Sequence, residues 1–468
     1  MNRYKKLFSD TAILAFGTFG SKLLVFFMMP LYTALLSTGE FGTAELITST
    51  ANLIMPFACV GISTGIFRYA AEKKANQEAV FSSGIALLGG GLGILLIIGI
   101  PLCFFGAFTF QARLIVLYVF FADVQAVCSQ YIRGIDRTKL FAVQGIFNTV
   151  LTILCNLLFL MVFNMGVTGY VLSVIIGNFV TVVFLVIAGK LWRVFRFSQI
   201  DRETVKDLLC FSLPMVPTTI CWLITDLSDR YFVNRICGEA VNGIYSAAYK
   251  IPTIVNLLSG IFMQAWHFSA VAQSKDETEC GKFYSEVFRG FLSLIFIGTA
   301  GLILCSRFLS RLLLASSYFE AWRYMPTLLC AMALESIVSF LASVYLVKKR
   351  TIHSFVTAVI GSGLNLLLNA LLIPQWGALG AAVATLLAYG GVYVIRMWDA
   401  PRILRFRLYL PRQLASITLL LASAAVMTFE VPGRLIWCAL CTLAVIALNL
   451  PSLLNGLKGM LNSVKSRI

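Results

Sequence analysis

Charged side chains stand in the middle of long apolar runs of this sequence. Lys22 lies inside the run 12–36, and Lys250 lies inside the run 241–266. A charged group deep in hydrocarbon costs about 3 kcal/mol on insertion scales, so each lysine needs a counter-charge or a hydrated cavity. The chemistry that two buried ammonium groups offer is the binding of an anionic group.

Carboxylates occupy apolar runs as well. Asp123 and Glu335 lie near the middle of the runs 112–131 and 324–347, and Glu45 lies near the start of another. We expect these acids to be buried counter-charges. The alternative to a cationic cavity is that lysines and acids pair only to join helices, which is a structural role.

Arginines stand toward the ends of three runs. Arg68 and Arg133 close the second and fourth runs on the side predicted to be cytoplasmic, and Arg230 lies toward the outer end of the seventh. Asp226, four residues before Arg230, would partly neutralise it on one helix face. For Arg68 and Arg133, a topology signal explains the charge as well as substrate binding does.

Asn365 and Asn369 share one helix face because they are four residues apart. Together with Thr385 and with Asp226 or Asp229, they form a candidate cation site, since hard cations such as sodium need several oxygen ligands. An ordinary hydrogen-bond network between helices is the alternative. No other metal site is expected, because the chain contains only 2 His.

The elements that position these side chains are predicted to be membrane-spanning helices. Of 468 residues, 59% are hydrophobic and 12% charged, and the mean hydropathy is +0.87. Such a chain has too little polar surface to cover a water-exposed body of this size. Runs of about 20 apolar residues predict helices, whereas a barrel would show short alternating strands. We expect about 14 spans, near 12–36, 43–66, 80–103, 112–131, 141–164, 167–188, 208–234, 241–266, 287–306, 324–347, 353–373, 377–397, 412–429 and 434–455.

The distribution of charge predicts the orientation. With the amino terminus in the cytoplasm, the inner loops and tails hold most of the 37 Lys and Arg. This is the bias of the positive-inside rule, so both termini are expected to be cytoplasmic. Topology and attraction to anionic membrane lipids explain the net charge of +16, and no nucleic-acid partner is expected.

The two halves of the chain resemble each other. The stretch 31–42 has a counterpart at 231–243, and an Arg-Thr pair precedes Asn156 as another precedes Asn369. Each offset encloses six predicted spans, and an even number preserves orientation. The predicted fold is therefore all-α and integral to the membrane, with two parallel six-helix lobes related by pseudo-twofold symmetry and a C-terminal helix pair. The expected boundaries are 1–188 for the N-terminal lobe, 189–207 for a basic and aromatic cytoplasmic linker, 208–398 for the C-terminal lobe and 399–468 for the pair.

Small residues and prolines predict how the helices pack. Gly61-x-x-x-Gly65 and Gly89-x-x-x-Gly93 each place two glycines on one helix face, where a neighbouring backbone can approach closely. Prolines within the runs predict kinks, because each removes a backbone hydrogen bond.

Several motifs carry a resemblance to a known family. They are Phe-Gly-Ser-Lys-Leu-Leu at 19–24, Pro-Leu-Tyr-Thr at 30–33, Gly-Glu-Phe-Gly at 39–42, Tyr-Ile-Arg-Gly at 131–134 and Gly-Ala-Leu-Gly-Ala-Ala at 377–382. With these motifs the chain resembles bacterial polysaccharide flippases of the O-antigen and capsule (Wzx-type) family. That family belongs to the superfamily that includes lipid II flippases and multidrug and toxin extrusion exporters.

The resemblance implies a transporter and not an enzyme. Such a protein moves an undecaprenyl-pyrophosphate-linked oligosaccharide from the inner to the outer leaflet of the bacterial cytoplasmic membrane by alternating access. The driving force would be the membrane potential, a cation gradient or both, with Na⁺ or H⁺ as the coupling ion and no other cofactor. Expected partners are the glycan substrate, membrane lipids, a glycan polymerase and glycosyltransferases. The residues that would receive the pyrophosphate are Lys22, Arg68, Arg230 and Lys250. Those that would bind sodium are Asp226, Asn365, Asn369 and Thr385.

Two other functions remain open at this stage. A multidrug or cation antiporter of the same superfamily would use the buried carboxylates to bind cationic amphiphiles. A membrane glycan polymerase or acyltransferase is a more distant alternative, since it would need a large outer loop or a catalytic His, Asp or Glu at the surface.

Overall fold

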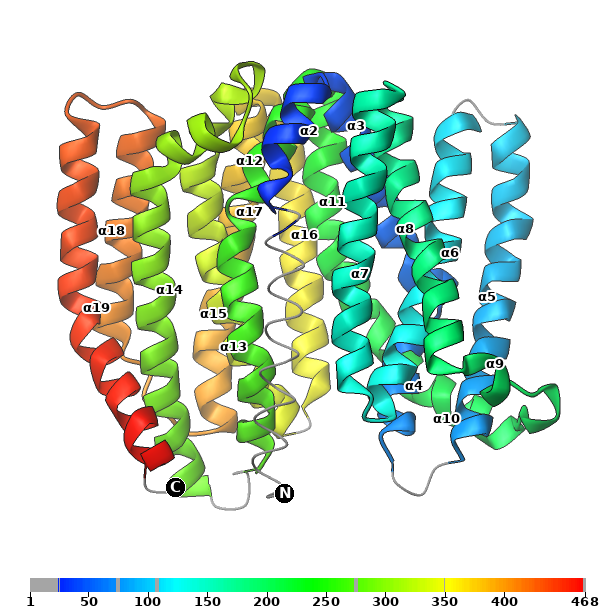
Figure 1. Cartoon of the computed structure of the whole chain (residues 1–468). Coiled ribbons are helices and arrows are strands. Elements are labelled where there is room, and N and C mark those ends of the chain that lie inside the picture. The colour runs from blue at the N-terminus through cyan, green and yellow to red at the C-terminus, as the bar shows by residue number, and fades with distance from the viewer. Residues whose placement is uncertain are drawn as a thin grey trace. The chain divides into compact units, whose positions relative to one another are not determined.

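The computed structural model of the chain describes residue 24 and residues 26–72, 76–105, 109–272, 277–348 and 350–465 (Figure 1). These residues form helices joined by short connections, and no strand occurs among them. The helices of the first part are α2 (Met29–Leu35), α3 (Thr38–Ala58), α4 (Ile62–Ala70), α5 (Gln77–Phe105), α6 (Thr109–Gly134), α7 (Thr138–Asn156), α8 (Gly166–Gly189), α9 (Leu191–Val194) and α10 (Arg202–Ser212). Those of the second part are α11 (Val216–Cys237), α12 (Glu239–Lys250), α13 (Thr253–Ala272), α14 (Glu277–Leu313), α15 (Met325–Val347), α16 (Thr351–Trp376), α17 (Ala378–Ile403), α18 (Leu410–Thr428) and α19 (Arg434–Lys465).

The chain is a multi-pass membrane protein. Ten of the described helices are long and apolar enough to cross a bilayer, and the number rises to 12 if each of two bent pairs is one span. These correspond to all the predicted runs except 12–36 and 241–266. Most of 12–36 lies outside the described residues.

The run 241–266 is not one continuous helix, so the prediction of an unbroken helix there is wrong. It divides into α12 and α13 at Ile251 and Pro252. Pro252 has no N–H to continue the helical ladder, and the Thr253 hydroxyl donates to the carbonyl oxygen of Lys250 at 2.5 Å. Lys250 therefore ends a helix instead of lying in the middle of one.

The predicted second span, 43–66, is sharply bent. Its two helices, α3 and α4, meet at 56° around Cys59–Gly61. Val60 and Gly61 both have left-handed backbones, with φ of 51° and 66°. Such backbones interrupt a right-handed helix, and the conformation is costly for a β-branched residue such as Val60. The second bent pair, α10 and α11, meets at a turn that contains Pro214.

The two glycine motifs behave differently. A Cβ on Gly61 would lie 2.9 Å from Val216 Cγ2, and one on Gly65 would collide with the Ser212 hydroxyl. These two glycines therefore allow α4 to pack closely against α10 and the start of α11. A Cβ added to Gly89 or Gly93 would have no neighbouring atom within 4 Å, so the prediction of a packing face there is wrong. Other glycines of α5 do pack closely, among them Gly91, on which a Cβ would strike the carbonyl oxygen of Ala58.

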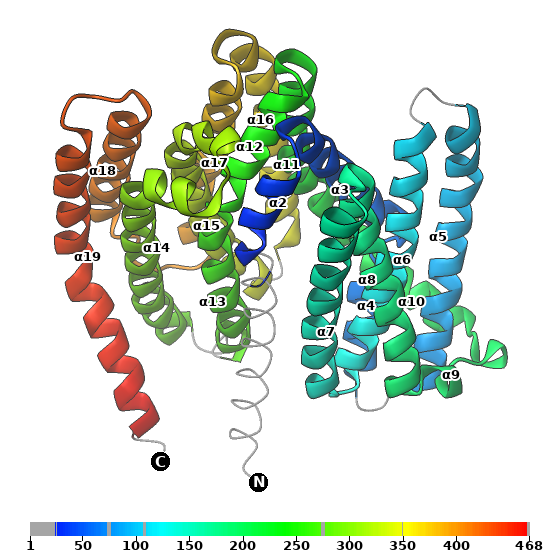
Figure 2. The same ribbon diagram turned by 45° about the horizontal axis from the view of Figure 1, so that its top comes forward.

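The chain forms two compact units, Met1–Leu227 and Ser228–Ile468. Within the first, α6 packs against α3, α5 and α8, and α7 packs against α8. Within the second, α15 packs against α13, α14 and α17, and α16 packs against α17 (Figures 1 and 2). The order of neighbours along the chain is the same in both units. Most of the predicted linker 189–207 forms α9 and the first half of α10, and α10 packs on α4 and α5 of the first unit.

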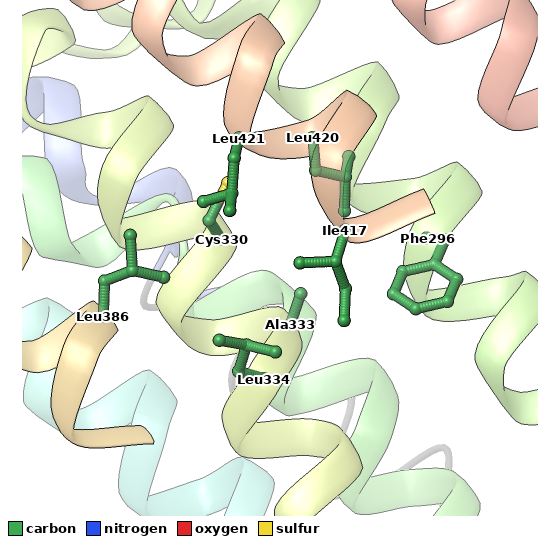
Figure 3. A pocket seen from close by; sticks show the side chains of 8 residues that line it. All are labelled: Phe296, Cys330, Ala333, Leu334, Leu386, Ile417, Leu420 and Leu421. Carbon is green, nitrogen blue, oxygen red and sulfur yellow. The ribbon is translucent and has the colours of Figure 1, made fainter. Parts of the chain in front are cut away.

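The helices α18 and α19 belong to the second unit and pack against its other helices. Both contact α14, and α18 also contacts α15. Figure 3 shows one of these contacts, where apolar side chains from α14, α15, α17 and α18, among them Phe296, Leu334 and Leu420, surround a hollow of about 10 Å³. So small and apolar a space does not hold ordered water, and it marks a packed helix interface.

Candidate functional site

A cluster of polar side chains surrounds one fully buried carboxylate in the second unit. Asp229 on α11 is 0% exposed. Its Oδ2 accepts hydrogen bonds from the hydroxyls of Tyr245, at 2.8 Å, and Thr385, at 2.5 Å. Its Oδ1 accepts from the amides of Asn369, at 2.7 Å, and Asn365, at 3.2 Å. Four helices, α11, α12, α16 and α17, thus each contribute to this group, which we call the Asp229 cluster.

The local sequence explains how the cluster is assembled. Asn365 and Asn369 project from one face of α16 because they are one helical turn apart. The chain then reverses at Gly377, whose φ of 59° suits glycine, and α17 returns along α16. A Cβ on Gly380 would strike the carbonyl oxygen of Leu372, so glycine is needed for this close approach. Thr385 is thereby brought beside the two asparagines.

The cluster offers oxygen atoms and a net negative charge. The four partners of the Asp229 carboxylate are neutral donors. Ser228 donates to Asn365 Oδ1 at 2.6 Å, whereas Asn369 Oδ1 is buried without a hydrogen-bond partner. A buried carboxylate without a cation is costly, and a bare amide oxygen beside it adds to that cost. Oxygen ligands of this kind suit a hard cation such as sodium.

The cluster includes most, but not all, of the residues that the sequence analysis selected. Asp229, Asn365, Asn369 and Thr385 come together, whereas Asp226 is exposed one turn earlier on α11. Tyr245 and Ser228 were not selected. Ser228 is adjacent to Asp229 in sequence, and this adjacency could have identified it. Tyr245 comes from a separate helix, and no spacing rule connects it with α11.

The four residues predicted to bind pyrophosphate fall in different parts of the chain. Lys22 lies outside the described residues. Arg68, at the end of α4 in the first unit, is exposed and pairs with Glu72 at 2.7 Å. Arg230 and Lys250 belong to the second unit and are half-buried, and the Arg230 guanidinium lies 5.7 Å from the ring centroid of Tyr249.

The acids predicted as counter-charges have polar partners. Glu45 is 3% exposed and accepts from the Tyr170 hydroxyl at 3.1 Å. Glu335 accepts from the Asn256 amide at 2.6 Å. Asp123, 1% exposed, lies near the Cys59 thiol, and its Oδ2 is buried without a hydrogen-bond partner. Because Cys59 lies at the break between α3 and α4, Asp123 lies beside that bend.

The last of the charged residues that the sequence pointed to is Arg133. Arg133 lies over the rings of Phe67 and Phe141, at 4.7 and 5.4 Å from their centroids. On α19, Cys438 and Cys441 have the C-x-x-C spacing of a metal-ligand pair. In the part of the chain that the structure describes, no group of three or more His, Cys, Asp or Glu could hold a metal ion.

Comparisons with known proteins agree on a family and a fold. Residues 7–267 match a family model described as "Polysaccharide biosynthesis protein". The lipid II flippase MurJ, in an inward closed conformation, superposes with a TM-score of 0.71 at 16% identity, covering 93% of this chain and 98% of that one. Inward-facing and outward-facing structures of a multidrug resistance MATE family transporter of the MOP superfamily give TM-scores of 0.65 and 0.63, both at 14% identity. They cover 82% and 86% of this chain, and 95% and 96% of their own. No curated protein sequence matches.

Proposed function

The chain belongs to the polysaccharide biosynthesis protein family, and from this premise we propose that it is a flippase for a lipid-linked oligosaccharide. It would move an undecaprenyl-pyrophosphate-linked glycan from the inner to the outer leaflet of the bacterial cytoplasmic membrane, as a Wzx-type member of the family. The observation that carries the proposal is that a sequence of this family adopts the fold of a protein named as a lipid II flippase. Both termini would be cytoplasmic, and the glycosyltransferases and polymerase of the same pathway would be its partners.

Alternating access requires two lobes that can move against each other. We propose that the lobes 1–188 and 208–398 are parallel repeats related by a pseudo-twofold axis. Supporting this, α6 and α15 occupy the same place in the packing order of their units, and so do α8 and α17. The prediction of 14 spans belongs to the same proposal, with the run 12–36 as the first span and with α12 and α13 together crossing once.

The substrate head needs fixed positive charge. A pyrophosphate loses its hydration in hydrocarbon at prohibitive cost, and cationic side chains in a wet groove would compensate. We assign this role to Lys22, Arg68, Arg230 and Lys250, while the polyprenyl tail stays in the lipid. Of the four, Lys250 ends α12 at the break before α13, where a helix terminus can move without loss of ladder hydrogen bonds.

The driving force follows from the charge of the substrate. Moving one elementary charge across 100 mV is worth about 2.3 kcal/mol, so two negative charges moved outward gain about 4 to 5 kcal/mol if they cross the whole field. A sodium ion at the Asp229 cluster would then act mainly on the empty carrier. Its oxygen ligands would come from Asp229, Asn365, Asn369 and Thr385, which requires the two amides to turn their oxygens toward the ion.

A test in cells separates substrate binding from folding. In cells whose chromosomal copy is deleted, the wild-type chain restores surface polysaccharide. Lys250→Gln is expected to reduce export at least tenfold while protein in the membrane stays at the wild-type level. The control is Lys348→Gln, at the end of α15, which removes the same charge and keeps export. Normal export by Lys250→Gln would contradict the assigned role.

A multidrug exporter is the second candidate, and one observation favours it. The carboxylate of Asp123 is buried in the first unit with a bare oxygen, and a cationic amphiphile would bind such a group. The fold similarity to MATE transporters is compatible with this function. The two functions differ in a simple assay. Deletion of a drug exporter raises susceptibility to cationic dyes without changing surface glycan, and deletion of a flippase does the reverse.

A further inference from the structure

Cationic side chains gather at one end of the second unit, outside the Asp229 cluster. They come from the first turns of α14, from the end of α17 and its connection to α18, and from the start of α18. Figure 1 shows these segments at the same end of this unit. We call them the arginine groove: Lys282, Arg289, Arg402, Arg405, Arg407 and Arg412. Among the described residues, none of the six forms an ion pair with a carboxylate.

The walls of the groove are held in place. The Arg407 amide donates to the Ser285 hydroxyl at 2.8 Å, and a Cβ on Gly281 would strike the carbonyl oxygen of Arg405. The connection therefore lies directly on α14. Between them is a space of about 780 Å³, lined by Lys282, Arg402, Arg405 and Arg407. A cavity of this size accommodates a lipid headgroup.

Beyond the residues that line this space are two arginines of like charge, Arg289 on α14 and Arg412 at the start of α18. Arg412 donates to Ser293 Oγ and Ser452 Oγ, each at 2.5 Å, and to Asn449 Oδ1 at 2.7 Å. All of these acceptors are neutral. Arg289 is close enough to repel Arg412, and its Nε is buried without a hydrogen-bond partner. Bringing two positive charges together costs free energy, and an anion bound between them would lower this cost.

The groove lies at the depth of lipid headgroups. The apolar helix Cys280–Leu313 has 34 residues, about 51 Å at 1.5 Å per residue, whereas the hydrocarbon is about 30 Å thick. The helix therefore extends beyond the hydrocarbon, and the charges of Lys282, Glu286 and Arg289 place its first turns there. Trp398 is 64% exposed, and the guanidinium of Arg402, which lines the groove, lies 3.3 Å from the centroid of its ring. An exposed tryptophan is typical of the membrane interface.

We propose that the arginine groove binds the phosphate of an anionic phospholipid from the leaflet that faces this end of the unit. Guanidinium groups donate two parallel hydrogen bonds to phosphate oxygens, which suits Arg405 and Arg407 on the wall and Arg289, one turn after Ser285 on α14. The site is separate from the residues assigned to substrate and sodium, and it does not depend on the transport function.

Native mass spectrometry of the purified full-length protein tests this. The protein in detergent is titrated with dioleoylphosphatidylglycerol, with dioleoylphosphatidylcholine, or with phosphatidylglycerol in the presence of inorganic phosphate. Phosphatidylglycerol is expected to bind at least tenfold more tightly than phosphatidylcholine, without competition from millimolar phosphate. Arg405→Gln/Arg407→Gln should weaken it about 25-fold, and Arg289→Gln about fivefold, since each charge near the surface contributes about fivefold in affinity.

The matched control is Arg235→Gln/Arg311→Gln. It also removes two exposed arginines from the second unit, but it leaves the groove intact, and it should bind phosphatidylglycerol as the wild type does. Equal affinity for the two lipids, or equal losses in the control and the groove variants, would overturn the proposal. Inorganic phosphate that binds as tightly as the lipid would overturn the assignment to a phospholipid. Arg405 and Arg407 are exposed and their side chains have no hydrogen-bond partner among the described residues, so their replacement leaves the fold intact.

Discussion

Asp229 has an environment that a purely structural role does not explain. It is fully buried, its hydrogen-bond partners are neutral, and a bare amide oxygen lies beside it on Asn369. A network that served only to join helices would be complete with an asparagine at this position. A single negative charge with surplus oxygen ligands is better explained by a monovalent cation that completes it.

Sodium should therefore stabilise the protein through Asp229. In detergent, replacing potassium by sodium at 100 times the dissociation constant is expected to add about 2.7 kcal/mol to the free energy of unfolding. Asp229→Asn should abolish this sodium-dependent shift, because the amide carries no charge. Thermal unfolding followed by intrinsic fluorescence measures it. Glu239→Gln, an exposed acid at the start of α12, serves as the control and should keep the shift.

A second prediction concerns Asp201, which caps the amino terminus of α10 outside the spans. The amide and the hydroxyl of Thr204 both donate to its carboxylate at 2.9 Å and hold its pKa below the usual 3.8. A lowered pKa in the folded state means that this contribution to stability is complete above pH 3.8 and is lost as the pH falls through the lowered value.

Asp201→Ser keeps a cap that does not titrate in this range. The wild type should therefore lose stability relative to Asp201→Ser as the pH is lowered from 5 to about 3, whereas the difference between the two should be constant from pH 5 to 7. Thermal unfolding of both proteins across this range measures the difference. A constant difference down to pH 3 would show that the capping bonds do not favour the ionised form.

At the scale of elements, the bend between α3 and α4 depends on one glycine of the neighbouring helix. Gly91→Ala would drive a methyl group into the Ala58 carbonyl oxygen, and overpacking of this kind costs about 1 to 3 kcal/mol. Gly93→Ala, two residues later and facing open space, should be neutral or stabilising by up to about 1 kcal/mol, as alanine favours helix. Comparing the unfolding temperatures of the two variants tests the packing. Equal effects would mean that Gly91 does not pack against the bend.

The elements also show what can be predicted from sequence. Apolar runs predicted the spans because burial in hydrocarbon depends on composition over about 20 residues. The breaks in these runs depend on single backbone conformations. Val60 gives no sign of its left-handed backbone, and Pro252 is no different in sequence from Pro56, which α3 accommodates. Asn365 and Asn369 could be paired by their spacing on one helix, but their meeting with Tyr245 at the Asp229 carboxylate depends on the packing of separate helices.

At the scale of the whole molecule, the proposed transport function rests on the family match and on the similar packing of the two units. The energy available from the membrane potential, about 4 to 5 kcal/mol for two charges at 100 mV, corresponds to more than a thousandfold bias toward the outer leaflet. A cation bound at Asp229 would change the rate at which the empty carrier returns without being needed for this bias. The substrate head and the sodium ion therefore have separable effects.

The most direct measurement is translocation in proteoliposomes. Purified protein is reconstituted with a fluorescent polyprenyl-pyrophosphate oligosaccharide, and a membrane-impermeant quencher reports how much of it reaches the opposite leaflet. The expected result is protein-dependent translocation that is faster with a potential negative on the donor side, and slower by at least tenfold for Lys250→Gln. If the labelled lipid crosses no faster than in protein-free vesicles, whatever the potential, the protein is not a flippase for this class of substrate.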